Sequence, residues 1–235
     1  DYVITNTKEK RKMACMDSKV IPIAAILDTE IMSSLPLKLT AATAMDALTH
    51  AIESYLSKGA FSFSEMLSLK AVSLISENFL KVLKNPNDYE VRKQLAIAQY
   101  IAGMSFTKVG LGIVHSMAHP LGALYDTPHG VANAIILPTG MEYNAPATGE
   151  KYRDIAKAMG VEGTEKMTQE EYRKAAIDAV KKLAADVGIP ADLKDIVKSE
   201  DIPFLAQSAY DDACRPGNPR ETSVEEITKL YESLL

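Results

Sequence analysis

Cysteine is scarce in this 235-residue chain, which has only Cys15 and Cys214, near opposite ends of the sequence. Disulfide-stabilised secreted domains and thiolate zinc sites need several cysteines at close spacing, so the sequence disfavours both. We expect two reduced thiols, each buried as a small apolar side chain.

Long apolar runs are also missing. Runs such as residues 21–27 and 131–137 contain seven residues each, whereas a membrane-spanning helix needs about 20. The amino end lacks the basic-then-apolar pattern that is typical of a secretion signal. We therefore expect a cytoplasmic protein that does not enter a membrane.

Basic residues are fewer than acidic residues and form no long cluster in the sequence. The chain has 26 Lys and Arg against 31 Asp and Glu, a formal net charge of −5, and its densest basic segment is the short KEKRK at residues 8–12. Nucleic acids and anionic membranes are therefore not expected as partners.

The sequence does have the composition of a globular protein, with 47% hydrophobic and 24% charged residues. Two short apolar stretches around a charged segment predict a hairpin within residues 1–16, and the apolar residues 21–28 predict a central strand. Because so few strands are followed by so many helical residues, these strands resemble the end of a sheet whose beginning lies outside the chain.

From residue 39 onward the apolar spacing is that of helices. Three are predicted at residues 40–58, 64–84 and 88–106, and a fourth around the histidines is expected to be interrupted at Pro120. Later helices are marked by capping boxes, at Thr168/Glu171 and Ser223/Glu226. We predict a mainly α protein of about nine helices.

All four histidines fall between residues 50 and 129. Asp46 and His50 are four residues apart, as are His115 and His119, and a helix places such pairs on one face. With His129, the sequence offers five candidate ligands. Imidazoles with one carboxylate suit Zn, Fe(II), Co or Ni, whereas Ca and Mg prefer oxygen. Four unrelated core or surface histidines are the alternative, but the paired spacing favours a metal site.

The glycines at 110 and 112 suggest a dinucleotide-binding loop, but the pattern is incomplete. His115 stands where the third glycine should be, and no strand of β-branched residues precedes the segment. We reject a nucleotide loop at this position.

Two segments carry a family resemblance: MDALTHAIESYLS at residues 45–57 and GLGIVHSMAHPLGALYDTPHGVANAIILP at residues 110–138. With them in view, the whole chain resembles the iron-containing, or group III, alcohol dehydrogenases. This resemblance implies a nucleotide-binding α/β domain followed by an all-helical, metal-binding catalytic domain. We expect residues 1–35 to be the remnant of the first and residues 36–235 to be the second. The start of the α/β domain, with its glycine-rich pyrophosphate loop, is expected to be missing from this chain.

The resemblance also implies roles for single residues. It excludes His119 from the ligand set and places it toward the nicotinamide and the substrate, as a catalytic proton relay. It makes Lys12 and Leu39 contacts of the dinucleotide, although Lys12 could equally be a solvated charge of the hairpin. The implied metal ligands are Asp46, His50, His115 and His129.

Three further residues match positions that line the family's substrate pocket, namely Phe106, Leu111 and Cys214. Phe106 and Leu111 could equally be plain core residues, because apolar residues at helical spacing are normally buried. Cys214 precedes a turn-rich loop at residues 215–220 and is less typical of a packed helix.

The resemblance implies an enzyme that uses Fe(II), with Zn(II) possible in the isolated protein, and NAD(H). The expected reaction is hydride transfer to or from a small alcohol or aldehyde, with lactaldehyde and 1,2-propanediol as the favoured pair, in a homodimer. Two alternatives stay open. One is another enzyme of the family, of the 1,3-propanediol, butanol or glycerol type; the other is a non-catalytic, metal-stabilised helical domain.

Overall fold

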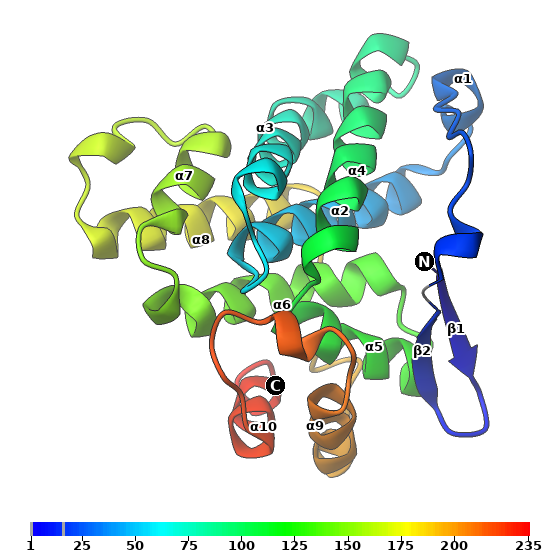
Figure 1. Ribbon diagram of the computed structural model, residues 1–235, viewed down its shortest axis with the longest axis vertical. Coiled ribbons are helices and arrows are strands. Elements are labelled where there is room, and N and C mark those ends of the chain that lie inside the picture. The colour runs from blue at the N-terminus through cyan, green and yellow to red at the C-terminus, as the bar shows by residue number, and fades with distance from the viewer. Residues whose placement is uncertain (1, 16) are drawn as a thin grey trace.

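The computed structural model describes residues 2–15 and 17–235, which form one antiparallel hairpin and a set of packed helices (Figure 1). Strand β1 (Tyr2–Asn6) pairs with strand β2 (Arg11–Cys15), with Asn6 opposite Arg11 at the charged turn. The predicted hairpin is therefore confirmed.

Ten α-helices follow in the described part of the chain: α1 (Thr29–Met32), α2 (Leu37–Leu56), α3 (Ser62–Lys84), α4 (Tyr89–Val109), α5 (Ile113–Tyr125), α6 (His129–Asn144), α7 (Lys151–Ala158), α8 (Gln169–Asp186), α9 (Ile202–Tyr210) and α10 (Val224–Glu232). This confirms the mainly α fold that the sequence predicts.

Local capping explains several helix starts. The Asp88 side chain accepts a hydrogen bond from the Val91 amide at 3.1 Å and begins α4. Both predicted capping boxes are present, at the starts of α8 and α10. Each box satisfies amide groups that have no partner inside the helix, so short sequence signals were sufficient to locate these ends.

Two local predictions are wrong. Residues 21–28 form no strand, and the side chains of Ile23 and Ile26 are fully or nearly fully exposed. A strand needs a neighbouring backbone to pair with, and in residues 2–15 and 17–235 only β1 and β2 pair, with each other. In addition, α5 continues through Pro120 to Tyr125, because tertiary packing outweighs the one backbone hydrogen bond that proline removes.

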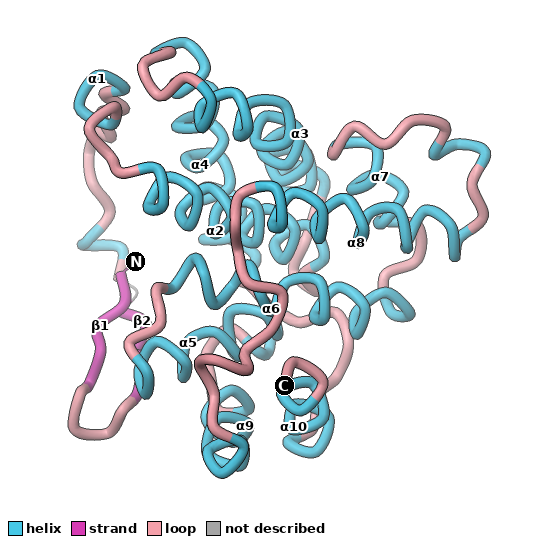
Figure 2. The backbone as a smooth tube through the Cα atoms, turned by 180° about the vertical axis from the view of Figure 1, so that it is seen from behind, coloured by secondary structure: helices cyan, strands magenta, loops and turns pink. Residues whose placement is uncertain are grey.

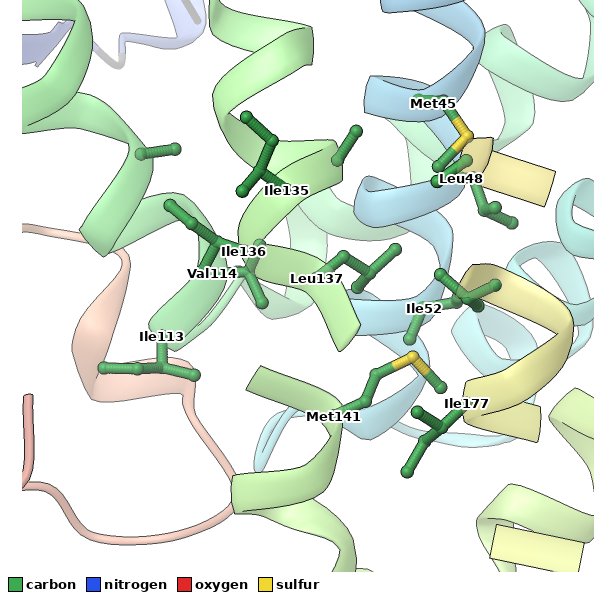
Figure 3. Close-up of a cluster of buried hydrophobic side chains, with 14 of the residues drawn as sticks. Met45, Leu48, Ile52, Ile113, Val114, Ile135, Ile136, Leu137, Met141 and Ile177 are labelled. Carbon is green, nitrogen blue, oxygen red and sulfur yellow. The ribbon is translucent and has the colours of Figure 1, made fainter. Parts of the chain in front are cut away.

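Helix α2 is the centre of the molecule. Fourteen of its 20 residues are buried, so it is covered on most sides rather than along one stripe. It contacts α3, α4 and α6, while α5 packs between α6 and α9 (Figures 1 and 2). Figure 3 shows the resulting core, where Leu48 and Ile52 of α2 lie in one cluster with Leu137 and Met141 of α6 and Ile177 of α8.

No single helix in the described residues is both long and apolar enough to cross a membrane. Helices α4 and α5 reach that length and composition only as a pair, and they are bent by 103° relative to each other.

Helices α2 and α6 approach closely at Gly130. A Cβ atom at this position would lie 2.1 Å from the Ala42 carbonyl oxygen and 3.3 Å from the Asp46 Cβ. Only glycine therefore allows the first turn of α6 to lie on the backbone of α2. The same contact brings His129, the first residue of α6, next to Asp46.

We predict that Gly130→Ala destabilises the protein by about 1–3 kcal/mol, because two backbones must move apart. The matched control is Gly103→Ala in α4, where an added Cβ meets no atom of the described structure within 4 Å. That change should be neutral or stabilise by up to about 1 kcal/mol, since alanine is the better helix former. Urea unfolding measures both. Equal stabilities for the two variants would contradict the close contact at Gly130.

Candidate metal centre

Four predicted ligands from three helices converge beside α2. Asp46, His50, His115 and His129 each offer one donor atom, and these atoms all lie within 4.8 Å of one another. The Asp46 carboxylate is at the centre: its oxygens lie 3.7 Å from His50 Nδ1, 3.7 Å from His115 Nε2 and 3.5 Å from His129 Nε2. The described residues thus contain a compact group of three nitrogen donors and one oxygen donor.

A fifth residue, Glu53, holds one of the imidazoles. Its carboxylate oxygen Oε2 lies 2.6 Å from His115 Nδ1, and both side chains are almost fully buried. The same carboxylate accepts the backbone N–H groups of Val114 and His115, at 2.7 and 3.2 Å. The other ring nitrogen, His115 Nε2, is buried and has no hydrogen-bond partner among the described residues. A buried polar atom without a partner is costly, and this one is directed at Asp46.

The surroundings give the three imidazoles different charge states. Burial lowers the pKa of His50 to about 3 and that of His129 to about 4, because the protonated form loses its hydration, and repulsion from His115 adds to the effect. Burial also opposes protonation of His115, but attraction to Asp46 and the hydrogen bond to Glu53 outweigh it and raise its pKa to about 9. His50 and His129 are therefore neutral near pH 7, with lone pairs free to bind a cation.

Asp46 stays ionised in this setting. Burial alone would raise its pKa, but the neighbouring imidazoles of His50 and His115 hold it well below the usual range. Asn133 adds a hydrogen bond from Nδ2 to Asp46 Oδ1 at 2.6 Å, and the same nitrogen lies 3.1 Å from His129 Nε2. The donor set thus combines an anionic oxygen with imidazole nitrogens, which suits borderline divalent cations.

His119 belongs to a neighbouring group. Its Nδ1 lies 2.8 Å from Asp212 Oδ2, and the other oxygen of Asp212 accepts the Cys214 backbone N–H at 2.8 Å. The His119 ring stacks on His129, with centroids 5.4 Å apart and planes 14° apart. Burial and Asp212 raise the pKa of the Cys214 thiol far above its usual value, so this sulfur remains protonated. His119 therefore lies beside the four converging side chains without joining them.

The other residues singled out from the sequence lie at different distances from this centre. The Phe106 ring stacks on His50, with centroids 4.5 Å apart, and Leu111 is buried just before α5. Leu39 is half-exposed on α2, seven residues before Asp46 and on the same helical face. Lys12 extends from β2 towards α5, where its Cε lies 2.9 Å from the position of a Cβ on Gly122.

A cavity of about 290 Å³ adjoins the centre between α1, α2 and α4. Asp46 and His50 form part of its wall, and the buried guanidinium of Arg92 forms another part. Arg92 donates hydrogen bonds to the backbone carbonyls of Met32, Ser33 and Pro86, so it fixes the segment after α1 as a wall of this cavity.

Sequence reasoning missed three residues that contact this region. Glu53 lies seven residues after Asp46, and Asn133 lies four residues after His129, so helical spacing could have identified both. Asp212 is 93 residues from His119, and no local pattern connects them.

Comparison with known proteins gives a consistent result. A sequence profile described as the Fe-containing alcohol dehydrogenase family, C-terminal, matches residues 40–235. The lactaldehyde reductase of Escherichia coli K12 is 51% identical over 234 residues, and the 1,3-propanediol dehydrogenase of Citrobacter freundii is 42% identical over 230 residues. These alignments cover 99% and 97% of this chain, but 60% and 59% of the relatives.

Solved structures agree with the sequence comparison. A 1,3-propanediol oxidoreductase superimposes with a TM-score of 0.95 at 40% identity, covering 99% of this chain and 61% of that one. An archaeal halo-thermophilic alcohol dehydrogenase, ADH/D1 from a Red Sea brine pool, gives 0.93 at 29% identity, covering 99% and 60%. The chain thus spans about 60% of the length of the curated relatives above. It belongs to the iron-containing alcohol dehydrogenase family.

Proposed function

We propose that this chain carries the metal centre of an NAD-linked alcohol dehydrogenase, with Asp46, His50, His115 and His129 as the ligands. One observation carries the proposal: three imidazoles and a carboxylate from three helices converge around a buried nitrogen, His115 Nε2, that has no partner in the described structure. Among the described residues, no Lys or Arg lies within ion-pair distance of Asp46 or Glu53. A divalent cation fits this donor set and its negative charge.

When bound, such a cation lowers the pKa of an alcohol hydroxyl and, in the reverse direction, polarises an aldehyde carbonyl. The residues of the chain have separate tasks around that chemistry. The four ligands would hold the cation, and two of them are supported by stacked rings: Phe106 packs on His50 and His119 packs on His129. Bound NAD(H) would supply or accept the hydride, and the task of the protein would be to place the reacting carbon of the substrate against it.

His119 is proposed as the catalytic proton relay. Its Nδ1 is held by the Asp212 carboxylate, so Nε2 is the atom that exchanges a proton with the substrate oxygen or with solvent. Lys12, Leu39 and His119 are proposed as contacts of the dinucleotide. Phe106, Leu111 and Cys214 are proposed to line the substrate pocket, in keeping with the stacking of Phe106 on His50 and the protonated thiol of Cys214.

We also propose the division at residues 35 and 36, with the nucleotide-binding remnant before it and the metal-binding helical domain after it. Fe(II) is the proposed physiological metal, since the family is described as Fe-containing. A nitrogen-rich site binds Zn(II) more tightly than Fe(II), so zinc is expected in protein purified in air. Metal analysis of anaerobically purified protein separates the two.

Lactaldehyde and 1,2-propanediol are the proposed substrate pair, on the strength of the 51% identity to lactaldehyde reductase. A specificity for 1,3-propanediol is the second candidate, supported by 42% identity and a TM-score of 0.95 to enzymes of that name. The experiment compares kcat/KM for 1,2-propanediol and 1,3-propanediol in the full-length polypeptide loaded with Fe(II) under anaerobic conditions. A tenfold or larger preference for 1,3-propanediol would overturn the first assignment.

The roles of His115 and His119 can be separated by substitution. His115→Ala removes one of four ligands, so metal affinity should fall by more than the about 10–100-fold that outer-shell changes cost. His119→Ala should leave the metal bound but lower kcat and alter its pH dependence, because a proton relay acts in turnover only. Metal content measured beside steady-state rates tests both. A His119→Ala protein that purifies without metal as completely as His115→Ala would make His119 a ligand.

Metal binding should also release a proton. In the metal-free chain the pKa of His115 is about 9, so near pH 7 both ring nitrogens are protonated and a cation at Nε2 must displace one proton. We expect Zn²⁺ affinity to rise by about tenfold per pH unit between pH 6 and 8, and to level off above the raised pKa, where the proton is already lost. His50 and His129 add nothing in this range, since their pKa values are about 3 and 4.

Isothermal titration calorimetry of Zn²⁺ binding, repeated in buffers of different ionisation enthalpy, measures how many protons are released. The release should persist in His119→Ala. Binding of Zn²⁺ without proton release near pH 7 would contradict the protonated state assigned to His115.

A further inference from the structure

We propose that Glu53 is a positioning residue of the metal centre, which fixes the tautomer of His115 so that Nε2 presents its lone pair to the cation. The inference rests on the proposed metal site and adds to it a residue outside the four ligands. Its basis is the set of contacts that one buried carboxylate makes at the start of α5.

Glu53 receives three N–H groups from one short segment. Oε1 accepts the Val114 amide at 2.7 Å, while Oε2 accepts the His115 amide at 3.2 Å and lies 2.6 Å from His115 Nδ1. Glu53 is only 4% exposed, and no other cationic group lies within ion-pair distance in the described residues. A carboxylate accepts and cannot donate, so each of these contacts requires a hydrogen on the nitrogen that faces Glu53.

The tautomer of His115 follows from this geometry. Once a cation has displaced the Nε2 proton, the hydrogen held on Nδ1 leaves the lone pair on Nε2, the atom that faces Asp46 without a hydrogen-bond partner in the described structure. The opposite tautomer would direct a hydrogen into the ligand set and exclude a cation. Hydrogen bonding of the second ring nitrogen to a carboxylate is a general means of orienting a histidine ligand and increasing its basicity.

Gly112, just before α5, leaves room for the Glu53 carboxylate because it has no side chain. A Cβ on Gly112 would lie 2.9 Å from Glu53 Oε1 and 2.7 Å from Asn218 Oδ1, so a side chain at this position would displace both groups. Asn218 Oδ1 accepts the Ile113 amide at 3.1 Å. Asn218 therefore caps one amide of α5 independently of Glu53, so the start of the helix does not depend on Glu53 alone. The contact of Glu53 that affects metal binding is the one with the His115 imidazole.

The test is Glu53→Gln. A glutamine has one acceptor oxygen and one NH₂ group, so it cannot accept all three N–H groups: an oxygen in the place of Oε2 loses the Val114 amide, and an oxygen in the place of Oε1 loses both His115 contacts. In the second arrangement the NH₂ faces Nδ1 and favours the wrong tautomer, and in the first a neutral amide holds the Nδ1 hydrogen less strongly than a carboxylate does. We expect Zn²⁺ affinity, measured by competition with a chromophoric chelator, to fall by about 10–100-fold. The matched control is Glu142→Gln on α6, where the carboxylate forms an exposed ion pair with Lys181; its affinity should be unchanged.

A double-mutant cycle separates positioning from a merely structural role. In a His115→Ala background, Glu53→Gln should have no further effect on Zn²⁺ affinity, because Glu53 acts through the imidazole that is no longer present. Additive losses in the two variants would overturn the proposal, as would Glu53→Gln with wild-type affinity. If His115→Ala itself leaves Zn²⁺ affinity unchanged, the proposed metal centre fails instead, so the two failures are distinguishable.

Nuclear magnetic resonance of the metal-free protein gives a readout independent of binding. The His115 Nδ1–H, held by Glu53 and shielded from water, should exchange slowly with solvent in the wild type and in Glu142→Gln. In Glu53→Gln this signal should exchange much faster or be lost, because a neutral amide holds the hydrogen less strongly, while thermal unfolding reports whether the fold is intact. A folded Glu53→Gln protein that keeps the slowly exchanging Nδ1–H would refute the role of the carboxylate.

Discussion

Two carboxylates on one buried helix set the main electrostatic constraint on this structure. Asp46 and Glu53 lie two turns apart on α2, and their ion-pair partners within the described residues are imidazoles only. Buried charges are costly unless they are paired and hydrogen-bonded. The arrangement of α5 and α6 around α2 therefore has to bring compensating groups to these two positions.

The two partner helices meet this requirement in different ways. Helix α5 directs its first amides at Glu53, so the partial positive charge of the helix start faces a carboxylate. Helix α6 approaches α2 without an intervening side chain at Gly130, which places His129 beside Asp46. Since the imidazoles of His50 and His129 are neutral, the compensation inside the cluster is incomplete, and a divalent cation would supply the remainder.

The graded surroundings of the histidines explain how similar side chains can have separate tasks. His115 is held between two carboxylates, His50 is packed against Phe106, and His119 is held by Asp212. In His115 and His119 a carboxylate therefore sets the role of one ring nitrogen, whereas His50 is positioned by ring stacking. A site built in this way is oriented before a ligand arrives, which reduces the cost of ordering it on binding.

Local sequence signals determined the hairpin, most of the helices, both capping boxes and the i,i+4 pair of Asp46 and His50, because each depends on residues within about one or two turns. Spacing alone nominated His119 as readily as His115, and only the fold directs its Nδ1 to Asp212. The strand expected at residues 21–28 failed for the same reason, since a strand requires a partner that no local pattern supplies. The contacts of Glu53 with α5 and the approach at Gly130 join segments 61–88 residues apart, so only tertiary packing could decide them.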